Sequence, residues 1–384
     1  MALPGRSSSI VRFRRSPHLV VYWRDNRLVA RDFISGSVVR AAPVVLGTLE
    51  FFSRWRTSGG LARHLGLNDG SAVRSLVKSL VRYGLLDTSD RARTSNATRL
   101  KQWDEWGLEA AFFHHATRNV TYAQPKSAEA RLQKKAARQA PPSPVKVTRG
   151  PRLRLPTPAL QMDLTDALRE RRTWRRFGRR PITRDALATL LGLTWGIQQW
   201  VDLAGYGRTP LTTSPSPGAR HSVEAYVLVR RIQGVPHGLY HYDADEHALV
   251  RITCGAPKRP SDYLPTQTWY NGASALVFMA SVFARAQWRY SDSRTYRSLL
   301  AEVGHQGQTF CLIATALGLA PFCSMALADS RIERDLGIDG ISEAVMYSVG
   351  VGTRPQGATW APWSGTSKVP QRTLAKPFAH ERLH

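Results

Sequence analysis

Short alternating and helical patterns of apolar residues divide the first ninety residues into several elements. Residues 20–33 (VVYWRDNRLVARDF) alternate around Asp25 and Asn26, which predicts a β-hairpin. Helices are predicted at residues 44–55, 61–65 and 71–86, and the third ends near Gly84. In this third helix the apolar residues recur at spacings of three and four, so they form one buried face.

A hairpin followed by helix, turn and helix is the outline of a winged-helix-like module, which we place at residues 17–90. Modules of this kind bind DNA, or they bind peptides along the exposed edge of the small sheet. The third helix carries Arg74, Lys78 and Arg82 at spacing four. This basic stripe is either a docking surface or the solvated face of an amphipathic helix, and the stripe alone does not decide between them.

Residues 91–155 are predicted to connect two domains. Residues 103–122 have a helical pattern, whereas residues 126–154 are rich in proline and carry nine basic residues against one acidic residue. This composition is typical of a mobile linker. Part of the positive charge of the chain is therefore expected to lie in a tether and not on a folded surface.

A larger domain is predicted at residues 156–356, followed by a C-terminal tail at residues 357–384. Helical and strand patterns are interleaved in it, and the strands follow one another as hairpins would, which indicates an α+β fold. The predicted helices are at residues 162–172, 185–198 and 296–317, and the predicted strands at residues 223–231, 238–243, 248–252, 276–282 and 344–351.

Composition excludes several classes of protein. The 384 residues include 54 Lys or Arg and 28 Asp or Glu, a formal net charge of +26, and the apolar fraction of 42% argues against disorder. No apolar run is long enough to span a membrane, and no export signal is recognised, so a cytoplasmic protein without a membrane partner is expected. Cys254, Cys311 and Cys323 are too few for a disulfide framework. The charge fits a nucleic acid, an acidic partner or ligand, or a solvated exterior.

A run of arginines at the end of the first helix of the larger domain is the first candidate for chemistry. Arg171, Arg172, Arg175 and Arg176 fall within six positions, and converging guanidinium groups hold phosphate well. The histidines at 237, 241 and 247 have no spacing that fits a metal site, so no metal is expected.

Five motifs in register resemble a known family. They are RRTWRRF from Arg171, PSPGARHSVEAY from Pro215, GLYHYD from Gly238, LAEVGHQGQ from Leu300, and ALGL from Ala316. Their order is similar to that of nitroreductase-fold flavoproteins and, within them, of the SagB-type dehydrogenases, the FMN-dependent azoline oxidases of peptide natural-product pathways. The resemblance covers residues 156–355. It implies a nitroreductase-like fold, bound FMN and a homodimer.

The resemblance also implies which residues contact FMN. The phosphate and ribityl chain would be held by the first motif, and the isoalloxazine ring would lie beside the loop of the second. Gln308 would lie beneath the flavin, and the residues after Leu319 would offer donors near the ring. The residues implied are Arg171, Arg172, Thr173 and Arg175; Ser214, Pro215, Ser216 and Gly218; Gln308; and Ser324 and Met325.

The predicted catalytic residues are Tyr290 and Arg289. The azoline oxidases carry a Lys-Tyr pair at this point, and this chain has Arg289-Tyr290. Oxidising an azoline ring to an azole transfers a hydride to the flavin and needs a base for the proton. An arginine stays protonated, so Arg289 is expected to act through its charge and Tyr290 as the base.

The favoured interpretation is therefore an FMN-dependent dehydrogenase that converts thiazoline or oxazoline rings of a modified precursor peptide to azoles, with dioxygen reoxidising the flavin. The N-terminal module would dock the peptide or a partner enzyme such as a cyclodehydratase. Two alternatives stay open: an NAD(P)H-dependent nitro- or quinone reductase, and an inactive protein that binds peptide or nucleic acid. Nucleic acid is the less favoured partner.

Overall fold

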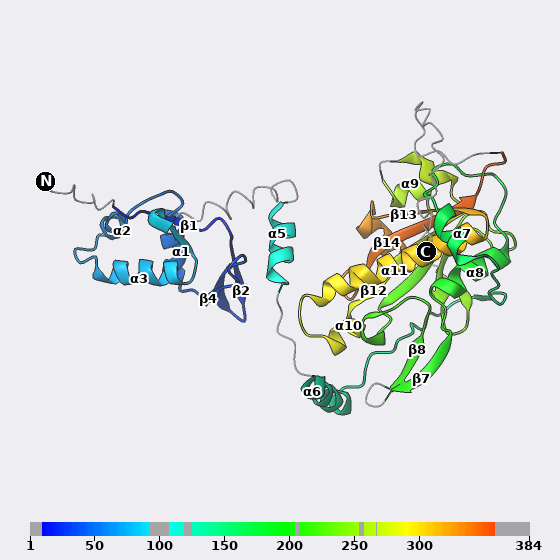
Figure 1. Cartoon of the computed structure of the whole chain (residues 1–384), viewed down its shortest axis with the longest axis horizontal. Coiled ribbons are helices and arrows are strands. Elements are labelled where there is room, and N and C mark those ends of the chain that lie inside the picture. Colours follow the sequence, from blue (N-terminus) through cyan, green and yellow to red (C-terminus); the bar gives the residue numbers. More distant parts are fainter. Residues whose placement is uncertain are drawn as a thin grey trace, which may run out of the picture. The chain divides into compact units, whose positions relative to one another are not determined.

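The computed structural model describes residues 10–91, 107–118, 125–203, 207–252, 257–265 and 267–357. The chain divides into two compact units, Met1–Thr121 and Tyr122–His384, which are described separately (Figure 1). Cys254 and residues 358–384 of the predicted tail lie outside the described residues. Within the described ranges, no helix is long and apolar enough to cross a membrane.

A three-stranded antiparallel sheet opens the first unit. Strand β2 (Leu19–Arg24) and strand β3 (Arg27–Asp32) form the predicted hairpin, and β4 (Val38–Arg40) pairs with β3 on its other side. Asp25 and Asn26 have φ values of 50° and 56°. Two successive left-handed residues make the tight turn that matches the twist of a hairpin, and Asp and Asn tolerate this conformation.

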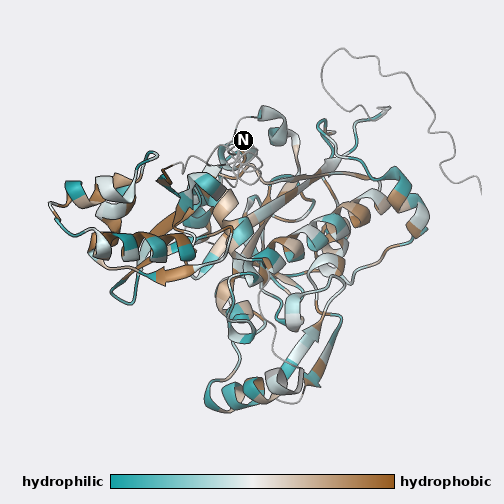
Figure 2. Cartoon of the chain, turned by 60° about the vertical axis from the view of Figure 1, so that its left-hand side comes forward, coloured by the Kyte–Doolittle hydropathy of each residue, from teal (hydrophilic) through white to brown (hydrophobic). Residues whose placement is uncertain are grey.

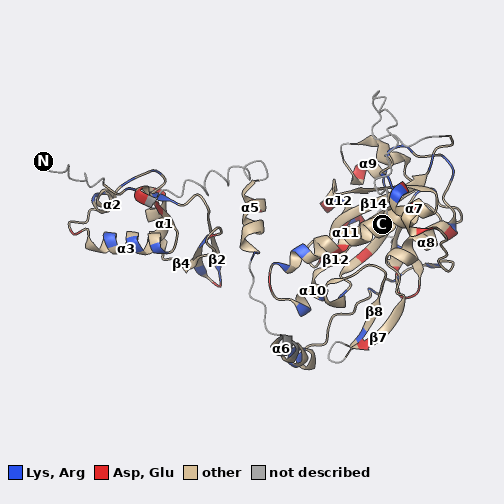
Figure 3. Cartoon of the chain, viewed as in Figure 1, with Lys and Arg blue, Asp and Glu red and all other residues tan. Residues whose placement is uncertain are grey.

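Three helices pack on this sheet, and the core between them is apolar. They are α1 (Pro43–Phe51), α2 (Ser58–His64) and α3 (Ser71–Arg82), and a second strand pair joins β1 (Phe13–Arg15) to β5 (Leu86–Thr88), which η1 (Ser89–Arg91) follows. Helix α3 buries Val73, Val77 and Leu80 and exposes its basic stripe, seen as blue segments in Figure 3. The winged-helix comparison stays a prediction.

Helix α5 (Gly107–Ala116) also belongs to the first unit. Arg31 donates a hydrogen bond from Nη2 to the carbonyl oxygen of Ala116 at 2.9 Å, and the rings of Phe33 and Phe112 lie 5.9 Å apart. The ring of His115 stacks on Phe33 at 6.1 Å. This histidine therefore has a packing role.

The second unit is built on a seven-stranded sheet in the order β13-β14-β12-β9-β10-β11-β6, and every neighbouring pair is antiparallel. This arrangement confirms the α+β fold class. The strands are β6 (Arg152–Arg154), β9 (Val223–Val229), β10 (Gly238–Asp243), β11 (Ala248–Arg251), β12 (Ala275–Val282), β13 (Leu319–Ser324) and β14 (Glu343–Thr353). A separate hairpin joins β7 (Gln199–Leu203) to β8 (Gly207–Leu211).

Both faces of this sheet are covered. On β12, Val277 and Met279 face one core cluster, while Leu276 and Phe278 face a second cluster on the opposite side, as period-2 alternation requires. Helices α8 (Arg184–Thr194) and α11 (Thr295–Ala316) cover the first face, and the long α11 interleaves polar with apolar residues (Figure 2). The remaining helices are α6 (Pro125–Arg138), α7 (Leu164–Glu170), α9 (Pro260–Tyr263), α10 (Phe283–Arg289), α12 (Asp329–Leu336) and the short η3 (Pro217–Ala219) and η4 (Thr268–Gly272).

The predicted linker differs most from the structure. Its first part forms helix α6, and its last part forms β6, which pairs with β11. Between them, Lys146 donates to the carboxylate of Glu343 at 2.5 Å, and Arg152 forms an ion pair with Asp243. Residues 146–154 are therefore fixed to the sheet, and their charge does not lie in a free tether.

Gly350 on β14 is packed tightly against the second apolar cluster of the sheet, so a substitution at this position tests that packing. A Cβ atom at this position would lie 2.7 Å from Cδ2 of Leu276 and also clash with the ring of Phe322. We expect Gly350→Ala to destabilise the second unit by about 1–3 kcal/mol and to lower its Tm by roughly 5 °C, measured by circular dichroism.

The matched control is Gly304→Ala on α11, where a Cβ atom would meet nothing within 4 Å. This variant should be neutral or more stable by up to ~1 kcal/mol, because alanine has the higher helix propensity. Equal Tm values for the two variants would contradict the packing described for Gly350.

Candidate functional site

The predicted catalytic pair lies at the end of α10, where it faces the predicted ring-binding loop. Arg289 donates a hydrogen bond from Nε to the hydroxyl oxygen of Tyr290 at 3.1 Å. Across from them, a Cβ atom added to Gly218 would lie 2.8 Å from the Tyr290 hydroxyl oxygen and would clash with the Arg289 side chain. Gly218 therefore meets a pair of residues that follows it about 70 positions later in the sequence, and only glycine fits at position 218.

The loop at residues 214–222 has a strained backbone. Gly218, Ala219 and His221 have φ values of 60°, 53° and 45°, and the left-handed conformation is costly for Ala and for His. Each such residue costs on the order of 1–3 kcal/mol and persists only where surrounding contacts hold it. Conformations of this kind cluster at binding and catalytic sites, so the strain supports a functional role for the loop.

Hydrogen bonds from α11 hold this loop. The hydroxyls of Ser214 and Thr309 lie 2.9 Å apart, and the buried carboxyl of Glu302 accepts the backbone N–H of Ser222 at 3.2 Å. The hydroxyl of Ser216 accepts the N–H of His221 at 2.8 Å and hydrogen-bonds with Glu302. The loop is thus fixed at its beginning, middle and end.

Glu302 is a functional candidate that sequence reasoning missed, although it lies within one of the five motifs. It has no exposed surface, and burial raises the pKa of its carboxyl to about 7. Its Oε2 atom has no hydrogen-bond partner among the described residues, nor has the buried Nε2 atom of the half-buried His221. Burial lowers the pKa of His221 to about 4, so this ring is neutral at pH 7. Two unsatisfied buried polar atoms beside a strained loop are typical of a site that receives a ligand.

A buried ion pair supports the loop from the other side. Arg285 contacts the carboxylate of Glu224 and donates to the carbonyl oxygens of His221 and Ser143. Glu224 also pairs with His241 at 2.7 Å. Burial alone would raise the pKa of Glu224, but the Arg285 and His241 charges outweigh it, and the pKa is lowered.

His241 is therefore held as a packed, hydrogen-bonded residue and not as part of a metal site. In the described part of the chain, no group of three His, Cys, Asp or Glu residues is placed to hold a metal ion.

The arginine run follows α7 and crosses the ends of two strands. The N–H of Trp174 donates to the carbonyl oxygen of Pro321 on β13, and the N–H of Gly178 donates to that of Thr353 on β14. Arg175 lies 5.8 Å from the ring of Trp269. Arg354, which the sequence analysis did not consider, lies 5.4 Å from the ring of Trp174. Cationic side chains therefore gather where β13, β14 and the run meet.

Helix α11 relates the arginine run to the loop. Its Cys311 lies 3.3 Å, Sγ to Sγ, from Cys323 on β13, and the hydrogen bond between them lowers the pKa of Cys323. Arg171 is close enough to act on both thiols through its charge. Along the axis of α11, Glu302 beside the loop and Cys311 near Arg171 are about 14 Å apart, and Thr309 lies between them.

The other predicted contacts are less closely assembled. Gln308 is exposed on α11, one residue before Thr309. Ser324 ends β13, its hydroxyl accepts the N–H of Ala326 at 3.1 Å, and Met325 is 66% exposed. Arg172 donates to the carbonyl oxygen of Arg169, while Thr173 is half-buried and Pro215 is exposed in its loop. The structure places these residues without testing their predicted contacts.

Comparison with known proteins identifies the class of this unit. The pattern of the Nitroreductase family matches residues 168–353, which include the arginine run, the loop, α10 and α11. The chain therefore contains a nitroreductase-family domain. Proteins of this family are flavin oxidoreductases.

Two curated relatives match this domain. The chain is 29% identical over 178 residues to MJ1384 of Methanocaldococcus jannaschii, named as a nitroreductase; the match covers 46% of this chain and 86% of that protein. It is also 29% identical over 168 residues to TfxB, the trifolitoxin-processing protein of Rhizobium leguminosarum bv. trifolii, with 42% of this chain and 45% of TfxB covered. The match thus spans less than half the length of TfxB.

Among solved structures, a nitroreductase crystal structure from Anabaena variabilis has a TM-score of 0.45 and 26% identity, and the match covers 54% of this chain and 42% of that one.

Glu302 gives a pH-dependent prediction. Its pKa is raised from 4.5 to about 7, so the stability that it contributes is fully present below pH 4.5 and is lost as the pH rises through 7. The loss amounts to roughly 3 kcal/mol. Glutamine stays neutral at every pH, so the variant Glu302→Gln does not show this loss. The free energy of unfolding of Glu302→Gln minus that of the wild type should therefore increase from pH 5 to pH 8.

Urea unfolding of both proteins at pH 5 and pH 8 measures this gain. His221 titrates in both proteins, so its contribution cancels in the difference. A stability difference between the two proteins that does not change with pH would contradict the raised pKa of Glu302.

Proposed function

We propose that this protein is an FMN-dependent dehydrogenase of the SagB type, which oxidises thiazoline or oxazoline rings in a ribosomally made precursor peptide to the aromatic azoles. The observation that carries the proposal is the meeting of Gly218, Arg289 and Tyr290, because it brings a candidate base against the loop that the resemblance assigns to the flavin ring. The similarity to TfxB, named for processing a peptide, supports a peptide substrate.

The residues present fit FMN at both ends of an elongated site. The arginine run and Arg354 offer cations for a phosphate, and an arginine fork suits phosphate oxygens geometrically. The loop has no Cβ atom at Gly218, and Glu302 and His221 each hold a polar atom without a hydrogen-bond partner among the residues that the structure describes. The distance of about 14 Å along α11 separates the two ends.

When bound, FMN supplies the hydride acceptor, and dioxygen restores its oxidised form. The chain positions the peptide ring and removes the proton. The ring loses one hydride and one proton from two neighbouring carbons, so that the carbon–carbon single bond between them becomes a double bond of the azole. Tyr290 takes the proton in its phenolate form and becomes neutral, and Arg289, which donates to the Tyr290 oxygen, stabilises the phenolate before the transfer.

The other parts of the proposal concern assembly. The first unit would dock the precursor peptide or a partner such as a cyclodehydratase, because a long peptide can be held at a distance from its reacting ring. A cytoplasmic homodimer, implied by the resemblance and by the cysteine content, stays a prediction.

The phosphate site is tested by flavin content. We expect the double variant Arg171→Ala/Arg175→Ala to purify with little or no FMN, because two phosphate partners are lost, whereas the wild type is yellow. The control removes the same charge nearby, at the exposed Arg179 and Arg180. Flavin released by heating and measured by fluorescence should be unchanged in Arg179→Ala/Arg180→Ala. Unchanged flavin in the first variant would overturn the phosphate site.

The reaction is tested with a synthetic peptide that contains one thiazoline ring. With FMN and air, mass spectrometry should show the loss of two hydrogen atoms from the peptide. Tyr290→Phe should keep its bound FMN but lose turnover by about 10²-fold or more, as expected for loss of a general base. Tyr296→Phe, in the same domain, serves as the control.

Full turnover by Tyr290→Phe would remove this tyrosine from the mechanism. An unchanged peptide, together with rapid bleaching of the flavin by NAD(P)H, would instead identify a reductase.

A further inference from the structure

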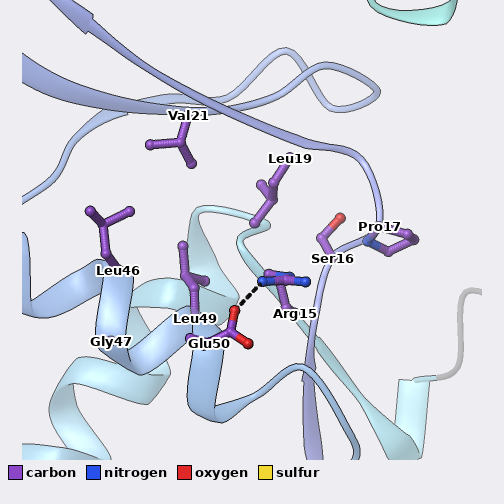
Figure 4. A pocket seen from close by; sticks show the side chains of 9 residues that line it. All are labelled: Arg15, Ser16, Pro17, Leu19, Val21, Leu46, Gly47, Leu49 and Glu50. Carbon is purple, nitrogen blue, oxygen red and sulfur yellow. Dashed lines mark hydrogen bonds and ion pairs between the residues drawn. The ribbon is translucent and has the colours of Figure 1, made fainter. Parts of the chain in front are cut away.

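The first unit contains a groove that the proposed chemistry does not use. It encloses about 570 Å³ between the edge of β2 and helix α1 (Figure 4). Leu19 and Val21 line it from the strand, and Leu46 and Leu49 line it from the helix. An ion pair between Arg15 and Glu50, 3.0 Å long, lies at one end. Ser16 also lines the groove, so apolar side chains form one part of its wall and polar groups form the other.

Strand β2 offers a free edge beside the groove. The small sheet has the order β2-β3-β4, so β2 pairs on one side only, and no backbone hydrogen bond from another described segment reaches its other side. An edge of this kind presents unpaired N–H and C=O groups that an extended chain can pair with. Leu19 and Val21 are two residues apart and therefore point to the same face of the strand.

Helix α1 has apolar residues on its exposed side as well as on its buried side. Val45 and Leu49 are buried in the core, yet Val44 is 55% exposed and Leu46 is 38% exposed. A helix on the surface of a soluble unit normally turns polar residues outward. The exposed apolar face of α1 beside a free strand edge indicates a surface that another segment covers.

The net charge of the first unit indicates which kind of peptide segment would bind in the groove. Residues 10–91 carry 14 basic and six acidic side chains, a formal net charge of +8. A phosphate backbone would not fit the groove itself, because the one cation that lines it, Arg15, already pairs with Glu50. An extended peptide with acidic residues could pair with the free strand edge, place apolar side chains against the apolar residues of the groove, and be attracted by the positive charge of the unit.

We propose that the groove between β2 and α1 binds an acidic peptide segment in extended conformation. The segment adds a strand to the free edge of β2 and places alternate apolar side chains against Leu19, Val21 and Leu46. Its acidic residues point outward to the basic surface of the unit. The identity of the segment as part of the precursor peptide rests on the proposed function, whereas binding itself does not.

Gly47 allows a direct test, because it lines the groove and a Cβ atom there would meet nothing within 4 Å. Gly47→Glu therefore fills the groove and adds a repelling charge without a clash inside the unit. Gly59 on α2 is also exposed and also has nothing within 4 Å of an added Cβ atom, but it does not line the groove. Gly59→Glu is thus a control with the same change of residue and of charge.

The probe is a fluorescein-labelled peptide of eight residues that alternates leucine with aspartate or glutamate, and binding to the full-length protein is followed by fluorescence anisotropy. We expect the wild type and Gly59→Glu to bind it equally and Gly47→Glu to bind at least about tenfold more weakly. A probe with lysine in place of the acidic residues should bind at least about tenfold more weakly than the acidic probe. A probe with proline at alternate positions should also bind more weakly, since it lacks the N–H groups for strand pairing.

Several results would overturn the proposal. They are equal binding of the acidic probe to Gly47→Glu and Gly59→Glu, no binding to the wild type, full competition by duplex DNA, or a wild-type dimer that Gly47→Glu dissociates in sedimentation runs. The last result would assign the groove to a second copy of the chain. Because the assay uses no flavin chemistry, loss of azoline oxidation with intact probe binding would reject the proposed function alone.

Discussion

The site of the second unit depends on one buried ion pair, between Arg285 and Glu224. The guanidinium of Arg285 donates to three separate parts of the chain. Its acceptors are the Glu224 carboxylate on β9, the carbonyl oxygen of His221 in the strained loop, and the carbonyl oxygen of Ser143 in the segment before β6. A planar guanidinium can serve several acceptors in fixed directions, which an ammonium group cannot do as well. Removing one partner of a buried pair leaves a charge without compensation, at a cost of about 3–5 kcal/mol.

The strained loop is possible because this pair and α11 hold it from two sides. Three left-handed residues would relax in an isolated peptide, but here the loop is bonded at Ser214, Ser216, His221 and Ser222. The loop is therefore formed before any ligand arrives, and its backbone need not reorganise on binding. Burial raises the pKa of the Glu302 carboxyl to about 7, so this support of the loop changes its charge near neutral pH.

Local patterns in the sequence predicted local structure well. The Asp25-Asn26 turn and the buried face of α3 both follow from short-range rules, and both are present. Strand β6 was not predictable in the same way, because its pairing with β11 lies almost a hundred residues away and its own composition is that of a linker. The resemblance, and not the pattern, placed Gly218 near Tyr290. Glu302 lay in a quoted motif, but its role depends on Ser222, 80 residues earlier, and on burial that no motif displays.

The structure shows where part of the net charge of +26 lies and what those basic side chains contact. Several arginines of the second unit are half-buried and donate to backbone carbonyl groups: Arg230 to Asn271, Arg231 to Gly272, and Arg354 to Leu319. Burial lowers the pKa of Arg230 and Arg231, so these cations lie partly out of water and act as structural donors. Other cations lie on exposed helix surfaces, in the α3 stripe of the first unit and at Arg131, Lys134 and Arg138 on α6 of the second. Charge alone therefore does not direct a partner to one unit, and in the first unit the groove beside β2 is the additional recognition feature.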